Sequence, residues 1–344
     1  MEDGRYVDGS PWFYAPNKGA PIFFAIAFFA SGCCHLWQTI RYKCWRLTGL
    51  YVICSFIFAA GFIVRELGAF DFKDLIKYIV SICLVYAAPP LYELGNYYVL
   101  GRILYFVPYY SPIHPGRVLT TFAAISMVVE ALNGNGAAYT ANQSLSKSQR
   151  DTGKALLQAA LLIQVVIVLL FVTLAGYFHL KCRRHGIRST KVDSPLLTLY
   201  LSSAIIAVRT IYRVVEYFDL ANVDYWAPDF SPASMSPLVR YEWFFYVFEA
   251  SLMLCNSVLL NVRHPRRWLP KSTKVYLARD GVSEIAGPGY KQDRNFFVTL
   301  VDPFDIYGIV KGRDKKTAFW DENDMAERQQ QQQAKSPSNG GTGS

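Results

Sequence analysis

The stretch KALLQAALLIQVVIVLLFVTLAGYFHL, residues 154–180, contains 27 residues and a single charged side chain, that of Lys154 at its start. A helix of about twenty apolar residues crosses roughly 30 Å of hydrocarbon, because each residue advances about 1.5 Å along the axis. A strand of a membrane β-barrel is shorter and alternates apolar with polar residues, and this continuous run does not alternate. The stretch therefore predicts a membrane-spanning helix.

Six further stretches of similar length and composition flank this one. The whole chain is 52% hydrophobic and 15% aromatic with only 18% charged residues, which leaves too little polar surface for several soluble domains. The sequence therefore predicts an all-α, polytopic membrane protein that folds as a seven-transmembrane-helix bundle. The predicted spans are residues 20–40, 46–66, 75–104, 118–140, 154–180, 195–218 and 241–262.

The loops between these spans differ in their content of basic residues. By these boundaries, 15 Lys and Arg residues lie on the side of the C-terminal tail and 9 on the other side, and basic residues favour the cytoplasm. We therefore expect the N-terminus outside and the C-terminus in the cytoplasm. The sequon Asn142-Gln143-Ser144 agrees, because this topology places its loop outside.

Three parts of the chain follow from this topology. Residues 1–19 are expected to form an extracellular N-terminal segment, and residues 20–270 the transmembrane domain. Residues 271–344 are polar and end in glutamine and Gly/Ser low complexity, so we expect a cytoplasmic, largely disordered tail.

Two of the predicted helices carry ionisable residues inside the membrane, where a charge near the bilayer centre costs roughly 2.5–3.5 kcal/mol. Residues with the spacing of one helical face lie in the sixth span, namely Arg209, Tyr212, Arg213 and Glu216. A matching stripe lies in the seventh span, namely Glu242, Tyr246, Glu249, Met253 and Asn256. A basic stripe therefore precedes an acidic one.

The depth of these residues predicts which of them meet. Arg209 and Glu249 lie about 13 and 12 Å below the outer ends of their antiparallel spans, and Glu130 and Gln164 lie about 15 Å below theirs. We expect Arg209 to pair with Glu249, with Glu130 and Gln164 close by, in a buried polar site at mid-membrane. The alternative is that this polar belt only holds the helices together.

Other polar residues in the spans give weaker signals. His35 is a candidate for binding, although a lone histidine near the end of a span more often serves packing. Glu93 and Asn96 share a face of the third span, after Pro89-Pro90, which is expected to kink or break that helix. Arg65 lies at the outer edge, where snorkelling of its side chain to the interface explains it.

The string RTIYRVVEYF, residues 209–218, resembles the R-x-x-Y-R-x-x-E signature of the fungal RTA-like proteins, the seven-helix lipid-translocating exporter family. Further matches keep the family's order along the chain: Tyr14-Ala15-Pro16, His35, Ala88-Pro89, Gly101-Arg102, Ser126, Gln164, Glu242 with Tyr246, and Asn261 with His264-Pro265. The departures are Glu249 in place of aspartate, Ala123 in place of aspartate, and Glu130 where glutamine is common.

The resemblance implies a function that composition does not give. It implies a lipid translocator or exporter that moves amphipathic molecules, such as sphingoid long-chain bases or toxic sterol-like compounds, and so confers stress or drug resistance. It also implies a fungal plasma membrane, or a vacuolar or other endomembrane, as the location. The alternative function is a seven-helix receptor or lipid sensor that uses the same pocket without transport.

Other classes of function lack their sequence signals. The chain has no G-x-x-x-x-G-K-[ST] phosphate loop and no G-x-S-x-G elbow, and too few intramembrane histidines for a zinc hydrolase. We therefore expect no enzyme, no catalytic residue, no metal and no cofactor. The expected partners are membrane lipids and an amphipathic substrate, because the net charge of +9 comes from basic clusters that face anionic lipid rather than nucleic acid. The sequence does not identify a protein partner for the tail.

Overall fold

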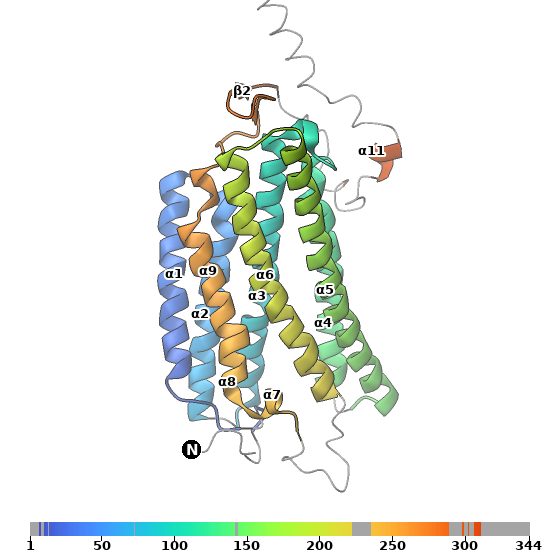
Figure 1. The fold of residues 1–344 in the computed structure, drawn as a ribbon. Helices are drawn as coiled ribbons and strands as arrows, with labels where there is room; N and C mark the ends of the chain where they lie inside the picture. The colour runs from blue at the N-terminus through green and yellow to red at the C-terminus, as the bar shows by residue number, and fades with distance from the viewer. Residues whose placement is uncertain are drawn as a thin grey trace, which may run out of the picture.

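The computed structural model describes residues 7, 10–12, 14–71, 73–141, 144–221, 235–288, 298, 302 and 306–310. Within these residues seven helices are long and apolar enough to cross a membrane, so the predicted all-α fold and its seven spans are confirmed. The helices form one bundle (Figure 1). We call the end where the first helix begins the N-terminal side and the end where the last span finishes the C-terminal side. Which side faces the cytoplasm stays a prediction, and Asn142 and Gln143 of the sequon lie outside the described residues.

The helices extend a few residues beyond the apolar runs that predicted them, because polar turns at their ends also hydrogen-bond as helix. The first six spans are α1 (Ala20–Tyr42), α2 (Trp45–Phe70), α3 (Leu75–Phe106), α4 (Pro115–Ala141), α5 (Lys147–Arg184) and α6 (Thr190–Ala221). The last span is built from α8 (Glu242–Phe245), the π-helical segment η3 (Tyr246–Ser251) and α9 (Leu252–Val262). The shorter elements are η1 (Pro108–Tyr110), α7 (Pro237–Arg240), η4 (Pro265–Arg267), β1 (Val275–Leu277), β2 (Glu284–Ala286) and α11 (Ile306–Val310).

Local sequence signals fix where several helices begin or end. Asp74 precedes α3, and its carboxylate accepts hydrogen bonds from the backbone N–H groups of Ile76 and Lys77 at 2.9 and 3.3 Å. Ser146 and Gln149 form a capping box at the start of α5. These bonds satisfy backbone donors that the first turn of a helix leaves unpaired.

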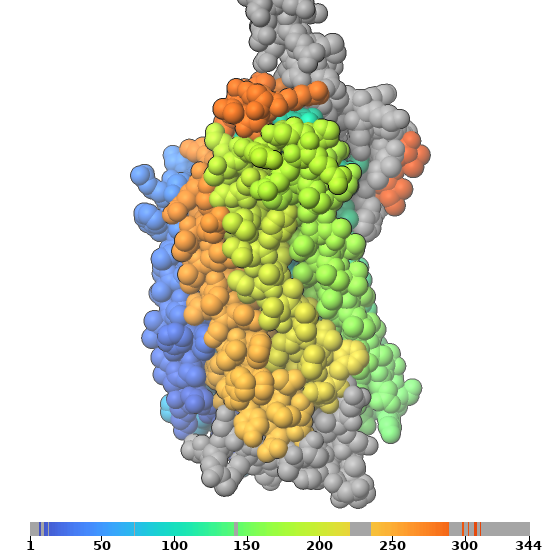
Figure 2. Space-filling view, viewed as in Figure 1, coloured from blue at the N-terminus to red at the C-terminus, as the bar shows by residue number. Residues whose placement is uncertain are grey.

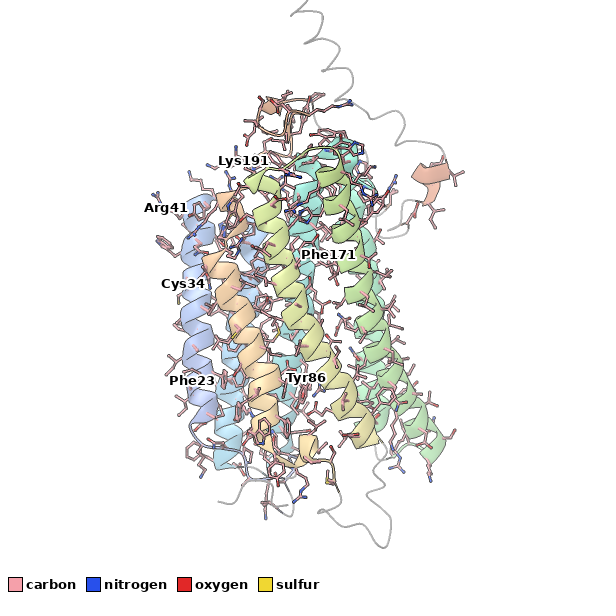
Figure 3. The ribbon with its side chains drawn as sticks, viewed as in Figure 1. Phe23, Cys34, Arg41, Tyr86, Phe171 and Lys191 are labelled. Atoms are coloured by element: carbon pink, nitrogen blue, oxygen red, sulfur yellow. The ribbon has the colours of Figure 1, made fainter. Side chains whose placement is uncertain are left out.

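Neighbouring helices pack in a closed ring, and one contact crosses its interior. The helix α2 contacts α1 and α3, α3 contacts α4, α5 contacts α4 and α6, and α9 closes the ring between α6 and α1 (Figure 1). The helix α3 also contacts α6 through the interior. Apolar side chains of α1 such as Phe23, which is 62% exposed, point away from the bundle (Figure 3). Such exposure is the expected state of a helix face that lipid covers.

The double proline does not break α3, which runs without interruption through Pro89 and Pro90. Of the expected kink or break, the break is therefore wrong, and the kink stays a prediction. Prolines are tolerated in membrane helices where neighbouring helices hold the segment, and both of these side chains lie within the packed part of α3.

Part of the polar tail is folded. The strands β1 and β2 form an antiparallel hairpin that lies on the C-terminal side of the bundle (Figure 2). Lys191 of α6 pairs with Glu284 at 2.6 Å, and the Tyr109 hydroxyl donates to the carbonyl of Ala278 at 2.9 Å. The expected tail begins at residue 271, and the structure gives residues 271–288 a definite conformation; the three-part division of the chain stays a prediction.

Gly95 of α3 permits a close approach of α2. A Cβ atom on this residue would lie 2.3 Å from Cε1 of Tyr51, whose ring is fully buried. We expect Gly95→Ala to destabilise the protein by about 1–3 kcal/mol, because the buried ring must shift. The measurement is thermal unfolding of the detergent-purified protein.

Gly176 of α5 supplies the matched control, because a Cβ there has no heavy atom within 4 Å. Gly176→Ala is expected to be neutral or slightly stabilising, since alanine favours a helix by up to about 1 kcal/mol over glycine. Equal melting temperatures for the two variants would contradict the close packing of α2 on α3.

Candidate functional site

A cavity of about 540 Å³ lies between the helices on the N-terminal side. Its wall comes from α3, α4, α5 and α6, and α7 and the segment before α1 lie at its outer end. Polar and charged residues in the wall are Tyr14, Arg65, Tyr78, Tyr86, Glu93, Glu130, Asn133, Gln164, Arg209, Arg213, Glu216, Tyr217 and Tyr241. With Arg65 of α2 and Phe245 of α8 included, six of the seven spans therefore contribute to one internal space, which begins near the N-terminal side and reaches residues predicted to lie at mid-membrane.

The remainder of the wall is apolar. Leu157 and Leu161 of α5, Leu220 of α6 and Leu238 of α7 line the cavity together with alanine and proline side chains. Such a wall accommodates a hydrocarbon chain, and the polar groups among it fix the orientation of a bound molecule.

Arg209 and Glu249 form an ion pair at the inner end of the cavity. The Nε atom of Arg209 donates to Oε1 of Glu249 at 2.7 Å, and Glu249 is fully buried. The predicted pairing of these residues is therefore confirmed. Arg209 lines the cavity, whereas Glu249 lies behind it and is not among the described lining residues.

Gln164 lies close to this pair, as expected, and contacts a residue from another helix. Its side-chain amide donates to Oε2 of Glu93, which also accepts from the Tyr97 hydroxyl at 2.9 Å. Glu93 is only 4% exposed, and both it and Gln164 line the cavity. Arg209 lies within electrostatic range of Glu93.

Glu130 also lines the cavity, from α4. It lies within electrostatic range of Arg209, but within the described part of the chain it has no cation at ion-pair distance. Glu130, Gln164 and Arg209 thus line one cavity, as predicted, but Glu130 is exposed and Gln164 half-buried, so the site is not buried throughout. Whether they bind a substrate stays a prediction.

A second cation of α6 has its own carboxylate. The Arg213 guanidinium pairs with Glu216, donates to the Tyr86 hydroxyl at 2.7 Å and lies 4.1 Å from the centre of the Tyr86 ring. Tyr86 lies inside the bundle in its N-terminal-side half (Figure 3). The Tyr212 hydroxyl donates to Glu216 at 3.0 Å, which positions the carboxylate from the other side.

A third ion pair links the last span to α2. Arg65 donates to Oε1 of Glu242 at 2.8 Å and to the Tyr14 hydroxyl at 3.2 Å, and Tyr246 donates to the same Glu242 oxygen at 2.9 Å. Glu242 also accepts from the backbone N–H of Asn17 at 2.7 Å. Burial raises the pKa of Tyr14 above its ordinary value, so its hydroxyl stays neutral in this cluster.

The snorkelling interpretation of Arg65 is therefore wrong. Its side chain is 3% exposed and points into the bundle, because a buried carboxylate and two hydroxyls receive it there. Sequence reasoning had one signal for this, namely that Glu242 lacked an assigned cation. This unassigned carboxylate did not by itself identify Arg65 as its partner, because Arg65 lies in a different span, 177 positions away.

The predicted stripe of the seventh span divides between two partners. Glu242 and Tyr246 contact Arg65, whereas Glu249 contacts Arg209. The π-helical segment η3 contains both Tyr246 and Glu249. A π-turn holds more residues than an α-turn, so the regular spacing that predicted one stripe does not apply across it.

Six of the twelve predicted site residues are absent from the described cavity lining. Tyr212, Glu242, Tyr246 and Glu249 lie beside it through the ion pairs described above, whereas His35 and Asn96 lie elsewhere. His35 is fully buried between α1 and α9, with its Nε2 atom 3.3 Å from the Ser257 hydroxyl. The amide of Asn96 donates to the Ser202 hydroxyl at 2.8 Å. Neither belongs to the described cavity lining.

The charges around the cavity do not balance. Each of the three arginines has a carboxylate of its own, which leaves Glu93 and Glu130 without a cation at ion-pair distance in the described part of the chain. The described residues contain no group of three or more His, Cys, Asp or Glu side chains that could hold a metal ion. The arrangement therefore suits a monovalent organic cation with an apolar chain.

Comparison with known proteins places the chain among fungal membrane proteins. A protein named "Lipid-translocating exporter-like protein RTA1" from Leptosphaeria maculans is 41% identical over 320 residues, which cover 90% of this chain. This chain spans 61% of the length of that relative. No solved structure matches the chain at a significant level.

Two more distant relatives carry related names. A protein of the same name from Ajellomyces capsulatus is 28% identical over 72% of this chain and 77% of its own length. A protein named "Sphingoid long-chain base transporter RSB1" from Saccharomyces cerevisiae is 25% identical over 67% of each chain.

The model of the family described as "RTA1 like protein" matches residues 51–272. The matched region begins in α2 and ends after the last span, so it contains six of the seven spans and more than half of the chain. The protein is therefore a member of the RTA1-like family of seven-helix membrane proteins.

Proposed function

We propose that the protein is a lipid translocator that exports amphipathic molecules with a cationic head, with sphingoid long-chain bases as the best-fitting substrates. The observation that carries the proposal is the cavity, where two carboxylates that have no ion-pair partner among the described residues lie in a largely apolar wall. A long-chain base combines a protonated amine with a hydrocarbon chain. The amine would contact the carboxylates of the cavity wall, and the chain would contact its apolar side chains.

The electrostatics of the site support a cationic substrate. An uncompensated carboxylate in a medium of low dielectric constant attracts a cation more strongly than the same group in water. Glu93 is held by Tyr97 and Gln164, so its position is fixed before the substrate arrives. Glu130 lines the same cavity from α4, and an amine bound by both carboxylates would contact both helices.

The size of the cavity also supports this substrate class. Ligand cavities in proteins have volumes of about 300–1,000 Å³, and 540 Å³ lies within that range. This volume receives a polar head and part of a chain, and the rest of the chain would extend between helices into lipid. The names of the relatives agree, since two are called lipid-translocating exporter-like and one a sphingoid long-chain base transporter.

The proposal includes no enzymatic step and places the protein in a fungal plasma membrane, where export of toxic amphiphiles would confer resistance. The alternative, a receptor or lipid sensor, would use the same cavity for binding and would show no flux. Transport and sensing therefore differ in one measurement, the movement of lipid by the purified protein.

The direct test uses liposomes that contain the purified protein and a fluorescent long-chain base. We expect the protein to accelerate movement of the base between leaflets, and Glu130→Gln to reduce this rate about tenfold or more, because a charge-assisted hydrogen bond contributes roughly 1.5–3 kcal/mol. The variant should keep the wild-type melting temperature, since Glu130 has no ion-pair partner among the described residues.

Glu284→Gln is the matched control, because Glu284 lies in the hairpin outside the membrane bundle and is expected to leave the flux unchanged. Equal rates with and without wild-type protein would refute transport. Binding of the base without flux would favour the sensor.

Glu249→Gln separates a binding role from a structural one. This change leaves Arg209 inside the bundle without its counter-charge, and breaking a buried pair in this way costs about 3–5 kcal/mol. We expect a large loss of folded protein, measured by size-exclusion chromatography and thermal unfolding, and partial recovery in the double variant Arg209→Gln/Glu249→Gln. A stable Glu249→Gln protein that has lost flux would instead assign Glu249 to the substrate.

A further inference from the structure

The last span and the face of α1 beside it carry a concentration of buried polar atoms that have no hydrogen-bond partner among the described residues. All of their residues are at most 9% exposed. The atoms are Oε2 of Glu249, Oδ1 and Nδ2 of Asn256, Nδ1 of His35, Oε1 of Gln38, Oδ1 of Asn261 and Nε2 of His264. These seven atoms are separate from the cavity, whose described lining includes none of their residues.

The atoms form a column along the bundle rather than a scattered set. On α1, Ser31, His35 and Gln38 follow steps of four and three, so they share one face. On the last span the column runs from Glu249 to His264, a rise of about 20 Å at about 1.5 Å per residue. The helices α1 and α9 pack side by side (Figure 1), and hydrogen bonds join Ser257 and Asn261 to α1. Glu249 and Asn256 continue the column along the last span, and Glu249 lies against α6.

Hydrogen-bonded hydroxyl groups connect the middle of this column. The Ser257 hydroxyl lies 2.6 Å from that of Ser31 and 3.1 Å from that of Ser55, which lies 3.0 Å from the Tyr92 hydroxyl. The side chain of His35 reaches the same Ser257 hydroxyl. Toward the C-terminal side, the Asn261 amide donates to Ser31 at 2.8 Å, and the Gln38 amide donates to the Asn261 carbonyl at 3.0 Å.

The energetics require partners for the remaining atoms. Each buried polar group without a hydrogen bond costs about 1–3 kcal/mol, so seven of them would consume a typical folding stability of about 5–15 kcal/mol. The set includes both donors and acceptors, and its one carboxylate is already paired with Arg209. A metal cation accepts only electron-pair donors, whereas water donates and accepts, and buried waters typically make about three hydrogen bonds.

We propose that ordered waters fill the α1–α9 interface and, together with the serine hydroxyls and His35, form a proton path from the C-terminal side of the bundle to Glu249. Chains of acidic, histidine and hydroxyl groups are the usual means by which membrane proteins move protons. The path ends at Oε2 of Glu249, the oxygen that does not contact Arg209.

Protonation at this end has a consequence for the cavity, and this step rests on the proposed function. A proton bound to Oε2 neutralises Glu249, which frees the positive charge of Arg209. Glu93 and Glu130 lie within electrostatic range of Arg209, so its guanidinium then competes with a cationic substrate for these carboxylates. Proton entry thereby favours release of the lipid amine, and proton loss restores the Arg209–Glu249 pair.

Other ionisable groups also face the path. Tyr51 and Cys54 of α2 and Tyr92 of α3 pack beside the Ser257 cluster, and Tyr42 and Arg266 contact His264 near the C-terminal side. Arg266 and Arg267 place positive charge at this entrance. In the proposed path, protons enter through His264 and the water molecules that bond to it.

Met253 provides a direct test for the waters, because it is fully buried between Glu249 and Asn256 on the last span. Hydroxyl radicals generated by brief X-ray pulses oxidise sulfur side chains next to bound water. We expect Met253 to be oxidised in the full-length protein in nanodiscs, and Asn256→Leu to reduce its oxidation rate at least threefold. An unmodified Met253 in the wild-type protein would overturn the hydrated path.

The variants in this test are chosen so that they fold. Asn256→Leu exchanges an amide without a protein partner among the described residues for an apolar group of similar size, so it removes only the proposed contacts to water. Ser81→Ala is the matched control, because Ser81 is equally buried on α3 but bonds only to the Tyr78 carbonyl of its own helix. It is expected to leave Met253 oxidation unchanged. A reduction in both variants would indicate a general structural change and would refute the assignment to this interface.

A second measurement tests proton coupling separately from transport. In liposomes a gradient of one pH unit is expected to change the distribution of a long-chain base by up to about tenfold for one proton per lipid. The Asn256→Leu protein should lose this response, and Ser81→Ala should keep it. Lipid flux that ignores the gradient in the wild-type protein would overturn coupling and leave the proposed function intact. Absence of any flux while Met253 is still oxidised would overturn the proposed function and retain the water path.

Discussion

The structure depends on the cost of placing charge inside a membrane bundle. Three arginines lie within or against the N-terminal-side half of the bundle, and each meets a carboxylate from another position in the chain. Arg65 meets Glu242, Arg209 meets Glu249, and Arg213 meets Glu216. Two of these pairs join the last span to other helices, so they fix where it packs. The pairs also bring α2, α6 and the segment before α1 to the rim of one cavity.

The same constraint gives the cavity its chemical character. Because every arginine is neutralised, Glu93 and Glu130 remain as the carboxylates that face the space without an ion-pair partner among the described residues. Their surroundings differ, since Glu93 is held by two hydrogen bonds whereas Glu130 projects from α4 into the cavity. A fixed acceptor and a more accessible one in the same cavity form a site for an amine, and the apolar wall around them receives a chain. The carboxylates that pair with arginines therefore differ from those proposed to bind the substrate, although all of them belong to the same polar belt.

Two polar systems share the interior of the bundle and meet at one residue. The cavity lies among α3, α4, α5 and α6, and the column of amides, hydroxyls and histidines lies between α1 and α9. In the proposed path Glu249 joins the two, because its Oε1 atom binds Arg209 at the cavity wall and its Oε2 atom has no hydrogen-bond partner among the described residues. Its place in the π-helical segment η3 gives it this double position, since a wider turn presents side chains in directions that an α-helix does not. An irregular turn at this point couples two regions that are otherwise separated by packed side chains.

The sequence by itself determined the seven spans, because hydrophobic length is set by the thickness of the bilayer and needs no knowledge of neighbours. Helical rise also gave the common depth of Arg209, Glu249, Glu130 and Gln164, since depth follows from counting residues along each axis. The tertiary structure alone decided which way the side chains turn. It assigned Arg65 to Glu242, withdrew Glu249 from the cavity wall, brought Glu93 into it and placed His35 in a different interface. Those choices depend on helix rotation and on the π-turn, and neither can be read from periodicity, because a polar residue on a helix face does not specify which of two adjacent helices it meets.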